Sequence, residues 1–164
     1  MTSRETAELL SVELPPAVEA RQVRGKTLAT LVSPGTEIAA NYRADPGRYP
    51  NRPGYAAVFK VEEAGSSVEG IEVGAGVFCM GNHRSVQQHD VDGVILVPED
   101  LSAAEALIAR LMGVSMTTLR TTSARPGDVV LVTGLGPVGY LAAHMFAVSG
   151  YEVHAVDPDP ARRA

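Results

Sequence analysis

Three glycines in the C-terminal part of the chain have a spacing that suits the binding of a pyrophosphate. Gly134, Gly136 and Gly139 form the pattern G-x-G-x-x-G between the β-branched run 129–133 and the mostly apolar stretch 140–148. The first glycine permits a tight turn, the second lets the backbone approach a pyrophosphate, and the third lets a helix lie close to the strand. The pattern therefore predicts a strand, a phosphate-binding turn and a helix.

Pro137, Val138 and Asp157 extend this pattern. Pro137 stands where the first helical turn would begin. Proline has no backbone N–H, but at this position an N–H would have no partner within the helix. The amides that follow it, beginning with Val138, would point at the phosphates. Asp157 ends a second apolar run, 151–156, where a carboxylate can accept hydrogen bonds from both ribose hydroxyls of adenosine.

The whole order of strand, glycine turn, helix, strand and acid favours a dinucleotide site over a glycine-rich turn in some other α/β unit. A 2′-phosphate would meet a negative charge at Asp157, so the pattern favours NAD over NADP.

Composition excludes several other classes of function. The chain has 164 residues and a net charge of −5, with no cluster of basic residues, which argues against a nucleic acid or an anionic membrane as partner. The N-terminus lacks the pattern of a signal peptide, and no run is long enough to span a membrane. The single cysteine, Cys79, fits a reducing cytoplasm and is expected to be buried and inert.

The first hundred residues contain short stretches that are typical of strands, separated by proline- and glycine-rich turns. Polar connections are expected at 18–25 and 81–92, and Thr36 is a candidate cap for a short helix. The predicted strands are 7–14, 26–32, 54–64, 77–80 and 94–97.

A helix is predicted after these strands. Ser102 and Glu105 form a capping box, in which each side chain bonds the backbone amide of the other residue. The helical pattern behind it has a possible break at Gly113. We therefore expect a β domain with a bridging helix at 1–121 and part of a nucleotide-binding domain at 122–164.

Only one β-α-β unit fits into the nucleotide-binding part, whereas a complete fold of this kind has about six parallel strands. We therefore expect the chain to be a piece of a longer protein. The 164 residues alone are expected to bind NADH weakly and to lack activity.

Several stretches resemble the medium-chain dehydrogenase/reductase superfamily. LVSPGTEIA resembles the segment that reads Cys-Gly-Thr-Asp in zinc alcohol dehydrogenases, RPGYAAVFKVEEAGSSVEG resembles their Pro-Gly-His-Glu strand, and RPGDVVLVTGLGPVGYLAA resembles their cofactor motif. The resemblance implies a mixed fold, with a GroES-like irregular β-barrel domain before the first β-α-β unit of a Rossmann-type domain.

The same resemblance implies that the zinc site is missing. Pro34 stands at the position of a ligating cysteine and Tyr55 at that of a ligating histidine, and the four-cysteine lobe of the zinc enzymes has no counterpart. The variants resemble a zinc-free branch that includes a bacteriochlorophyllide hydroxyethyl dehydrogenase. The implied activity is hydride transfer between NAD and a secondary alcohol or carbonyl, in a cytoplasmic enzyme. The resemblance also suggests a homodimer for the full-length form.

Three residues are candidates for handling the proton. Thr36 matches a hydroxyl of the family's proton relay, Tyr55 could donate a proton to a substrate carbonyl, and His83 lies in a loop that resembles one near the cleft of the zinc-free relatives. Each has a structural alternative: a helix cap, a packed aromatic ring and an exposed loop residue. Glu37 matches a carboxylate behind the metal and is expected to be solvated or paired with an arginine.

Two other functions stay open at this point. One is a zinc-free reductase of quinones or enoyl groups, which in this superfamily usually prefers NADPH. The other is a folded fragment without turnover.

Overall fold

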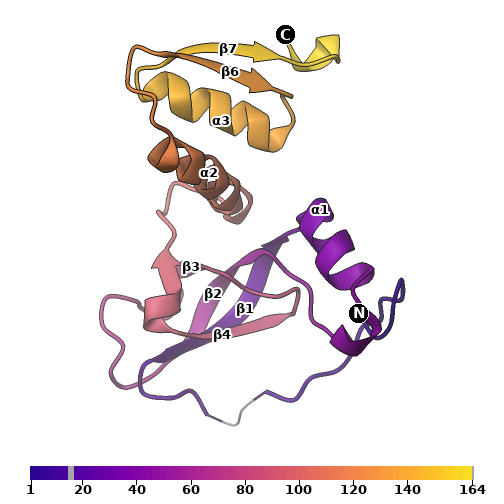
Figure 1. The fold of residues 1–164 in the computed structure, drawn as a ribbon. Helices are drawn as coiled ribbons and strands as arrows, with labels where there is room; N and C mark the ends of the chain where they lie inside the picture. Colours follow the sequence, from indigo (N-terminus) through magenta and orange to yellow (C-terminus); the bar gives the residue numbers. More distant parts are fainter. Residues whose placement is uncertain (15–16, 164) are drawn as a thin grey trace. The chain divides into compact units, whose positions relative to one another are not determined.

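The structure is a computed structural model that describes residues 1–14 and 17–163. It contains two compact units, Met1–Leu107 and a second unit from Ile108 onward (Figure 1). The division falls inside helix α2 (Ala103–Thr121), and each unit is described by itself. The predicted domain boundary after Thr121 stays a prediction.

An antiparallel sheet of five strands, in the order β4-β1-β2-β3-β5, forms the first unit (Figure 1). Every neighbouring pair of strands in it is antiparallel. Its strands are β1 (Gln22–Leu31), β2 (Ala56–Ala64), β3 (Gly76–Cys79), β4 (Val86–Asp90) and β5 (Val94–Leu96).

The central strand β2 carries most of the core of this unit. Its first four residues, Ala56 to Phe59, are almost completely buried, because side chains from both faces of β2 have apolar partners. Phe59 belongs to the cluster on one face, together with Val23 and Val77, and Val58 belongs to the cluster on the other, together with Leu107. Both clusters remove apolar surface from water, which is the main source of stability.

Short helices follow β1. Helix α1 (Pro34–Glu37) continues into a π-helical turn (Ile38–Tyr42), and a 3₁₀ turn (Pro46–Arg48) lies in the loop before β2. Another 3₁₀ turn (Val91–Gly93) joins β4 to β5. The proline at the start of α1 occupies a position that needs no amide donor.

Helix α2 begins with the predicted capping box. The Ser102 amide donates to Glu105 Oε2 at 2.8 Å, and the Glu105 amide donates to Ser102 Oγ at 3.3 Å. These bonds satisfy two amides that the first helical turn leaves without partners. The helix passes through Gly113 without interruption, so the expected break there is wrong.

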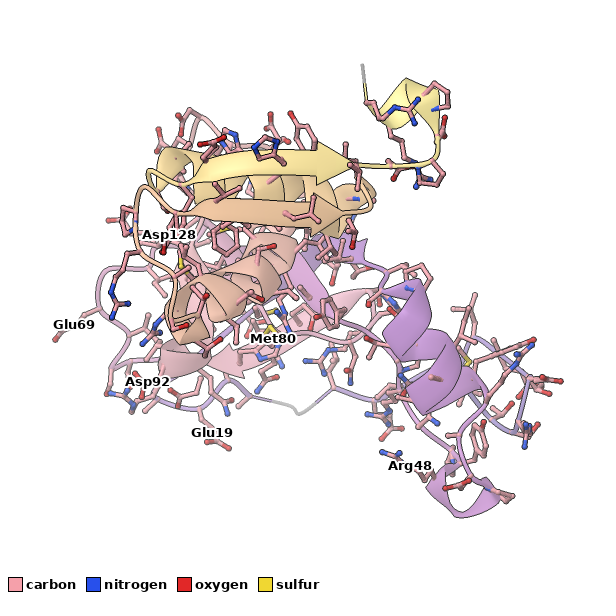
Figure 2. All side chains as sticks on the ribbon, turned by 45° about the horizontal axis from the view of Figure 1, so that its top comes forward. Glu19, Arg48, Glu69, Met80, Asp92 and Asp128 are labelled. Atoms are coloured by element: carbon pink, nitrogen blue, oxygen red, sulfur yellow. The ribbon has the colours of Figure 1, made fainter. Side chains whose placement is uncertain are left out.

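The second unit contains a parallel β-α-β arrangement made of β6 (Val129–Thr133), α3 (Pro137–Val148) and β7 (Glu152–Val156), followed by a 3₁₀ turn (Pro160–Arg162). Figure 1 shows α3 along one face of the two strands. Asp128, labelled in Figure 2, precedes β6, and its carboxylate accepts a hydrogen bond from the Arg125 amide at 2.7 Å. The strand, helix and strand of the glycine pattern are therefore confirmed.

Three expectations about strands were wrong. Residues 7–14 form no strand, because this segment pairs with no other and Leu9 is fully exposed. Strand β1 begins at Gln22, inside the segment expected to be a connection. Strand β4 lies in the polar segment 81–92, since Gln87 is buried there through hydrogen bonds instead of apolar contacts.

Although a β-branched run of this kind is typical of a strand buried on both faces, β6 is open on one face in the described residues. Leu131 is 63% exposed, and Val129 is similarly open. Helix α3 covers only one face of the two-stranded sheet, and the alternating exposure along β6 follows from the alternation of side chains in a strand.

Cys79 provides a test of the core. It ends β3 beside the exposed Met80 (Figure 2), is itself 1% exposed, and burial raises the pKa of its thiol to about 11. Because only the thiolate reacts with iodoacetamide, we expect labelling at about pH 8 to be roughly 100-fold slower in the folded chain than in urea. Equal labelling rates, measured by mass spectrometry, would contradict this burial.

Candidate functional site

The glycine turn joins the end of β6 to the start of α3. Gly134 has a φ of +91°, a left-handed conformation that strongly favours glycine, and its amide donates to the Val156 carbonyl at 2.7 Å. The turn is thereby tied to the end of β7. The sequence places the bend here because a β-branched strand meets a residue without a side chain.

Gly139 lets the first turn of α3 lie against this bend. A Cβ atom at Gly139 would come within 1.8 Å of the Gly134 carbonyl oxygen, whereas one at Gly136 would meet nothing within 4 Å. The predicted role of the third glycine in close packing is therefore visible in the structure. The space beside Gly136 leaves its backbone open to a ligand.

The start of α3 has the properties of an anion site. Gly136 occupies the N-cap position, no side chain caps the helix there, and Pro137 contributes no amide. Within residues 1–14 and 17–163, the amides of Val138 and Gly139 have no hydrogen-bond acceptor. Such amides, with the positive end of the helix dipole, attract negative groups.

Asp157 faces the glycine turn from the end of β7. Its Oδ2 accepts a hydrogen bond from the Leu135 amide at 2.7 Å, and its Oδ1 accepts one from the Asp159 amide at 2.8 Å. Both hydrogen bonds lower the pKa of the carboxyl group, and the bond from Leu135 has the larger effect. The side chain is 3% exposed, so the carboxylate is held firmly beside the turn.

Two arginines lie close to Asp157. Arg162 Nη1 is 3.6 Å from Asp157 Oδ2, and Arg163 donates a hydrogen bond to the Asp157 carbonyl oxygen. Arg162 also pairs with Asp159 at 3.8 Å and is 55% exposed. A carboxylate has about four acceptor positions, of which the amides of Leu135 and Asp159 take two, and Arg162 lies close to Oδ2 as well.

A second cluster lies in the first unit and centres on His83. His83 Nε2 is 2.9 Å from Glu37 Oε2, and His83 Nδ1 is 2.8 Å from the Thr30 hydroxyl. Glu37 is buried, and its Oε1 accepts a hydrogen bond from the Ser33 amide at 3.0 Å. The expectation that Glu37 is solvated or paired with an arginine is therefore wrong.

The backbone holds the His83 loop in place. The His83 amide donates to the Pro53 carbonyl oxygen at 2.9 Å, which joins this loop to the segment just before β2. The structure thus brings together residues from β1, α1, the Pro53 segment and the His83 loop. The alternative that His83 is an exposed loop residue does not hold, since its side chain is 26% exposed and both ring nitrogens have partners.

The other two proton-handling candidates have different surroundings. Thr36 lies inside α1, is exposed, and accepts a hydrogen bond from the Ser33 hydroxyl at 3.1 Å. Its expected role as helix cap is wrong, because Ser33 occupies the N-cap position. Tyr55 is half-buried directly before β2.

Sequence reasoning missed Thr30 and Leu135. Thr30 is an ordinary strand residue in sequence, and Leu135 enters the site through its amide, which no side-chain pattern can indicate. The burial of Glu37 had no signal in the sequence either, since only the structure shows that this carboxylate is enclosed and needs a distant partner.

Gly139 and Gly136 allow a matched test of the turn. We expect Gly139→Ala to destabilise the second unit by about 1–3 kcal/mol, because the new methyl group overlaps the Gly134 carbonyl. Gly136→Ala meets open space and serves as the control, with a change expected below about 1 kcal/mol. Urea denaturation followed by circular dichroism measures both, and equal losses would contradict the close packing.

The lowered pKa of Asp157 predicts that the stability of the folded chain depends on pH. Its pKa is lowered in the folded chain from an ordinary value of 3.8, so its contribution to stability is present above that value and is lost as pH falls through the folded pKa. We expect wild type to have a higher urea midpoint than Asp157→Asn at about pH 6. The difference should shrink as pH falls below about 4, and a difference that does not change with pH would refute this assignment.

Comparison with known proteins gives one sequence relative. No model of a protein family matches the chain. An alcohol dehydrogenase from Geobacillus stearothermophilus is 28% identical over 142 residues, which cover 67% of this chain and 42% of the relative. The chain thus spans less than half the length of this curated relative.

Solved structures share the fold. Galactitol-1-phosphate dehydrogenase from Escherichia coli matches with a TM-score of 0.79 and 15% identity, over 98% of this chain and 56% of that protein. Quinone oxidoreductase from Escherichia coli, complexed with NADPH, matches with a TM-score of 0.70 and 22% identity, over 92% and 49%. An alcohol dehydrogenase homologue and this shared fold together confirm that the chain resembles the medium-chain dehydrogenase/reductase superfamily.

Proposed function

We propose that the natural full-length protein is a zinc-independent, NAD-dependent oxidoreductase that transfers a hydride between nicotinamide and a secondary alcohol or carbonyl. The observation that carries the proposal is the parallel β-α-β unit whose glycine turn is bonded to Asp157. The alcohol dehydrogenase relative and the dehydrogenase structures support the reaction class.

The second unit fits the adenosine half of the cofactor. The amides of Val138 and Gly139 lack partners in the described chain and would bind the pyrophosphate, with Gly136 leaving space for it. The Asp157 carboxylate would accept the ribose hydroxyls, with the exposed Arg162 moving away from Oδ2. When bound, NAD supplies or accepts the hydride.

The first unit would handle the proton. Thr36, Tyr55 and His83 remain the candidates, and among them His83 has an imidazole whose two nitrogens both have partners. An alcohol that loses a hydride must also lose a proton, so a positioned base is required.

The side chains that could bind a metal ion support a mechanism without zinc. Pro34, which stands where the zinc relatives have a cysteine, has no side-chain donor. Across residues 1–14 and 17–163, no group of three His, Cys, Asp or Glu side chains is placed to hold a metal ion. Three protein ligands are the usual number in a catalytic zinc site.

A reductase of quinones or enoyl groups is the second candidate. It is favoured by the quinone oxidoreductase structure that contains NADPH and by the position of Arg162 and Arg163 beside Asp157, where a 2′-phosphate would find positive charge. The carboxylate of Asp157 argues for NAD instead. A folded fragment without turnover is the remaining alternative for the 164 residues alone.

Cofactor preference tests the proposal. In calorimetric titration of the natural full-length protein, we expect NADH to bind at least about tenfold more tightly than NADPH, because like charges at Asp157 disfavour the 2′-phosphate. Asp157→Ala should abolish this preference. Asp159→Ala removes the same charge from an exposed position and serves as the control, in which we expect the preference for NADH to remain.

Two results would count against the proposal. Tighter binding of NADPH than of NADH would favour the quinone or enoyl reductase. Absence of any change in NADH absorbance with a panel of secondary alcohols and carbonyls would refute the proposed reaction.

A further inference from the structure

We propose that His89 is a pH-sensitive latch for the side chain of Arg84. The neutral imidazole and the guanidinium share one buried oxygen of Gln87, and Arg84 leaves this oxygen when His89 takes up a second proton. All three side chains belong to the first unit, and none of them is a candidate for cofactor binding or proton transfer. The inference is a regulatory device that goes beyond the proposed function and does not depend on it.

Gln87 lies on β4 at the centre of this cluster, and it is completely buried. Its Nε2 group donates to the Asn82 carbonyl oxygen at 2.9 Å and to Thr27 Oγ1 at 3.3 Å. Its Oε1 accepts from Arg84 Nε at 3.0 Å and lies 3.2 Å from His89 Nε2. A carbonyl oxygen can only accept and a guanidinium can only donate, so the orientation of the Gln87 amide is fixed from both ends.

This orientation also fixes the position of the proton on His89. Gln87 Oε1 can only accept, so Nε2 of the neutral imidazole must carry the hydrogen and donate it. The two lone pairs of the oxygen are then occupied, one by His89 and one by Arg84. A second proton on His89 must therefore enter at Nδ1, and the resulting cation would share its acceptor with the guanidinium.

In the part of the chain that the structure describes, the elements around the His89 ring bring no negative charge to it. Strand β1 places Val23 opposite His89, and β2 places the Phe59 ring at 6.1 Å. Strand β3 ends at the Cys79 thiol, which stays neutral because burial raises its pKa to about 11. Burial, followed by the positive charge of Arg84, accordingly lowers the pKa of His89.

The carboxylates that follow His89 in the sequence are directed elsewhere. Side chains alternate along a strand, so Asp90 lies on the face of β4 opposite to His89. Asp90 lies 3.9 Å from Arg21, and Asp92 lies 2.8 Å from the same guanidinium. Within residues 1–14 and 17–163, neither carboxylate accepts a hydrogen bond from His89.

Arg84 is the partner that leaves when both groups are charged. It is exposed, and both of its acceptors in the described chain are neutral. Its second hydrogen bond, to the Gln88 carbonyl oxygen, is long at 3.4 Å. Burial, and to a smaller extent the positive charge of Arg52, lower the pKa of Arg84, so the charged guanidinium is already disfavoured at this place. His89, by contrast, is held in β4 by the pairing of that strand with β1.

The direction of the switch follows from the lowered pKa of His89. Its ordinary value is 6.5, and the folded chain holds the second proton less strongly than the unfolded chain does. The latched state is therefore complete above about pH 6.5, and it is lost as pH falls through the folded pKa of His89. An acidic medium thus releases the Arg84 guanidinium to the solvent.

Hydrogen exchange at the arginine side chains of the 164-residue chain tests the latch. NMR gives the rates at which the Nε–H groups of Arg84 and Arg52 exchange with water, while the ring signals of His89 report its protonation. The exposed Arg52 supplies the ordinary effect of pH on exchange. We expect the ratio of the Arg84 rate to the Arg52 rate to rise about tenfold as His89 is protonated, because one hydrogen bond to Gln87 is lost.

Three variants separate the latch from a general effect of acid. His89→Gln is neutral at every pH, so its exchange ratio should stay constant. Arg84→Ala should raise the midpoint of the His89 titration toward the ordinary value of 6.5, because the second cation at Gln87 is gone. Arg52→Ala is the matched control, since it removes a positive charge near Arg84 and should leave that midpoint unchanged.

Several outcomes would overturn the proposal. The first is an exchange ratio that stays constant in wild type while His89 titrates. The second is a His89 midpoint that Arg84→Ala leaves unchanged, or that Arg52→Ala raises equally. The third is a His89 that stays neutral down to the pH of unfolding, because the latch would then never open in the folded chain. None of these measurements involves a cofactor or turnover, so the latch and the proposed function can fail separately.

Discussion

The hydrogen bond from the Leu135 amide to the Asp157 carboxylate joins the glycine turn to the end of β7, and it illustrates the constraint on which both clusters depend. A carboxylate that is removed from water costs free energy unless hydrogen-bond donors replace the solvent. Asp157 meets this requirement with the amides of Leu135 and Asp159, and Glu37 meets it with the Ser33 amide and His83. Each acid therefore fixes the backbone around it.

This constraint explains why the candidate sites contain so few apolar contacts. The glycine turn has a single side chain between its first two glycines, that of Leu135, so hydrogen bonds to Asp157 and to the Val156 carbonyl hold the turn against the end of β7. In the first unit, α1 has only four residues and is too short to be stable alone. The bonds of Glu37 to Ser33 and His83 connect this short helix to a loop that comes much later in the chain.

The parallel unit could be predicted from the sequence because its signals are local. A β-branched run, a glycine turn and an apolar helix that begins at a proline follow one another directly, and β6 has the bounds 129–133 that the sequence indicated. Strand β4 could not be predicted in this way, because Gln87 is buried through bonds to Thr27 and Asn82. The His83 cluster was also out of reach, since it joins residues 46 and 53 positions apart.

The two buried carboxylates differ in the kind of hydrogen-bond donor that each one binds. Both amides that bind Asp157 belong to the backbone and cannot release their protons, so Asp157 can hold a shape but cannot take part in proton transfer. Glu37 has one such amide and one imidazole, so one of its two partners is a side chain from a loop that comes later in the chain. Asp157 therefore fixes backbone segments alone, whereas Glu37 fixes the start of α1 and the ring of His83 together.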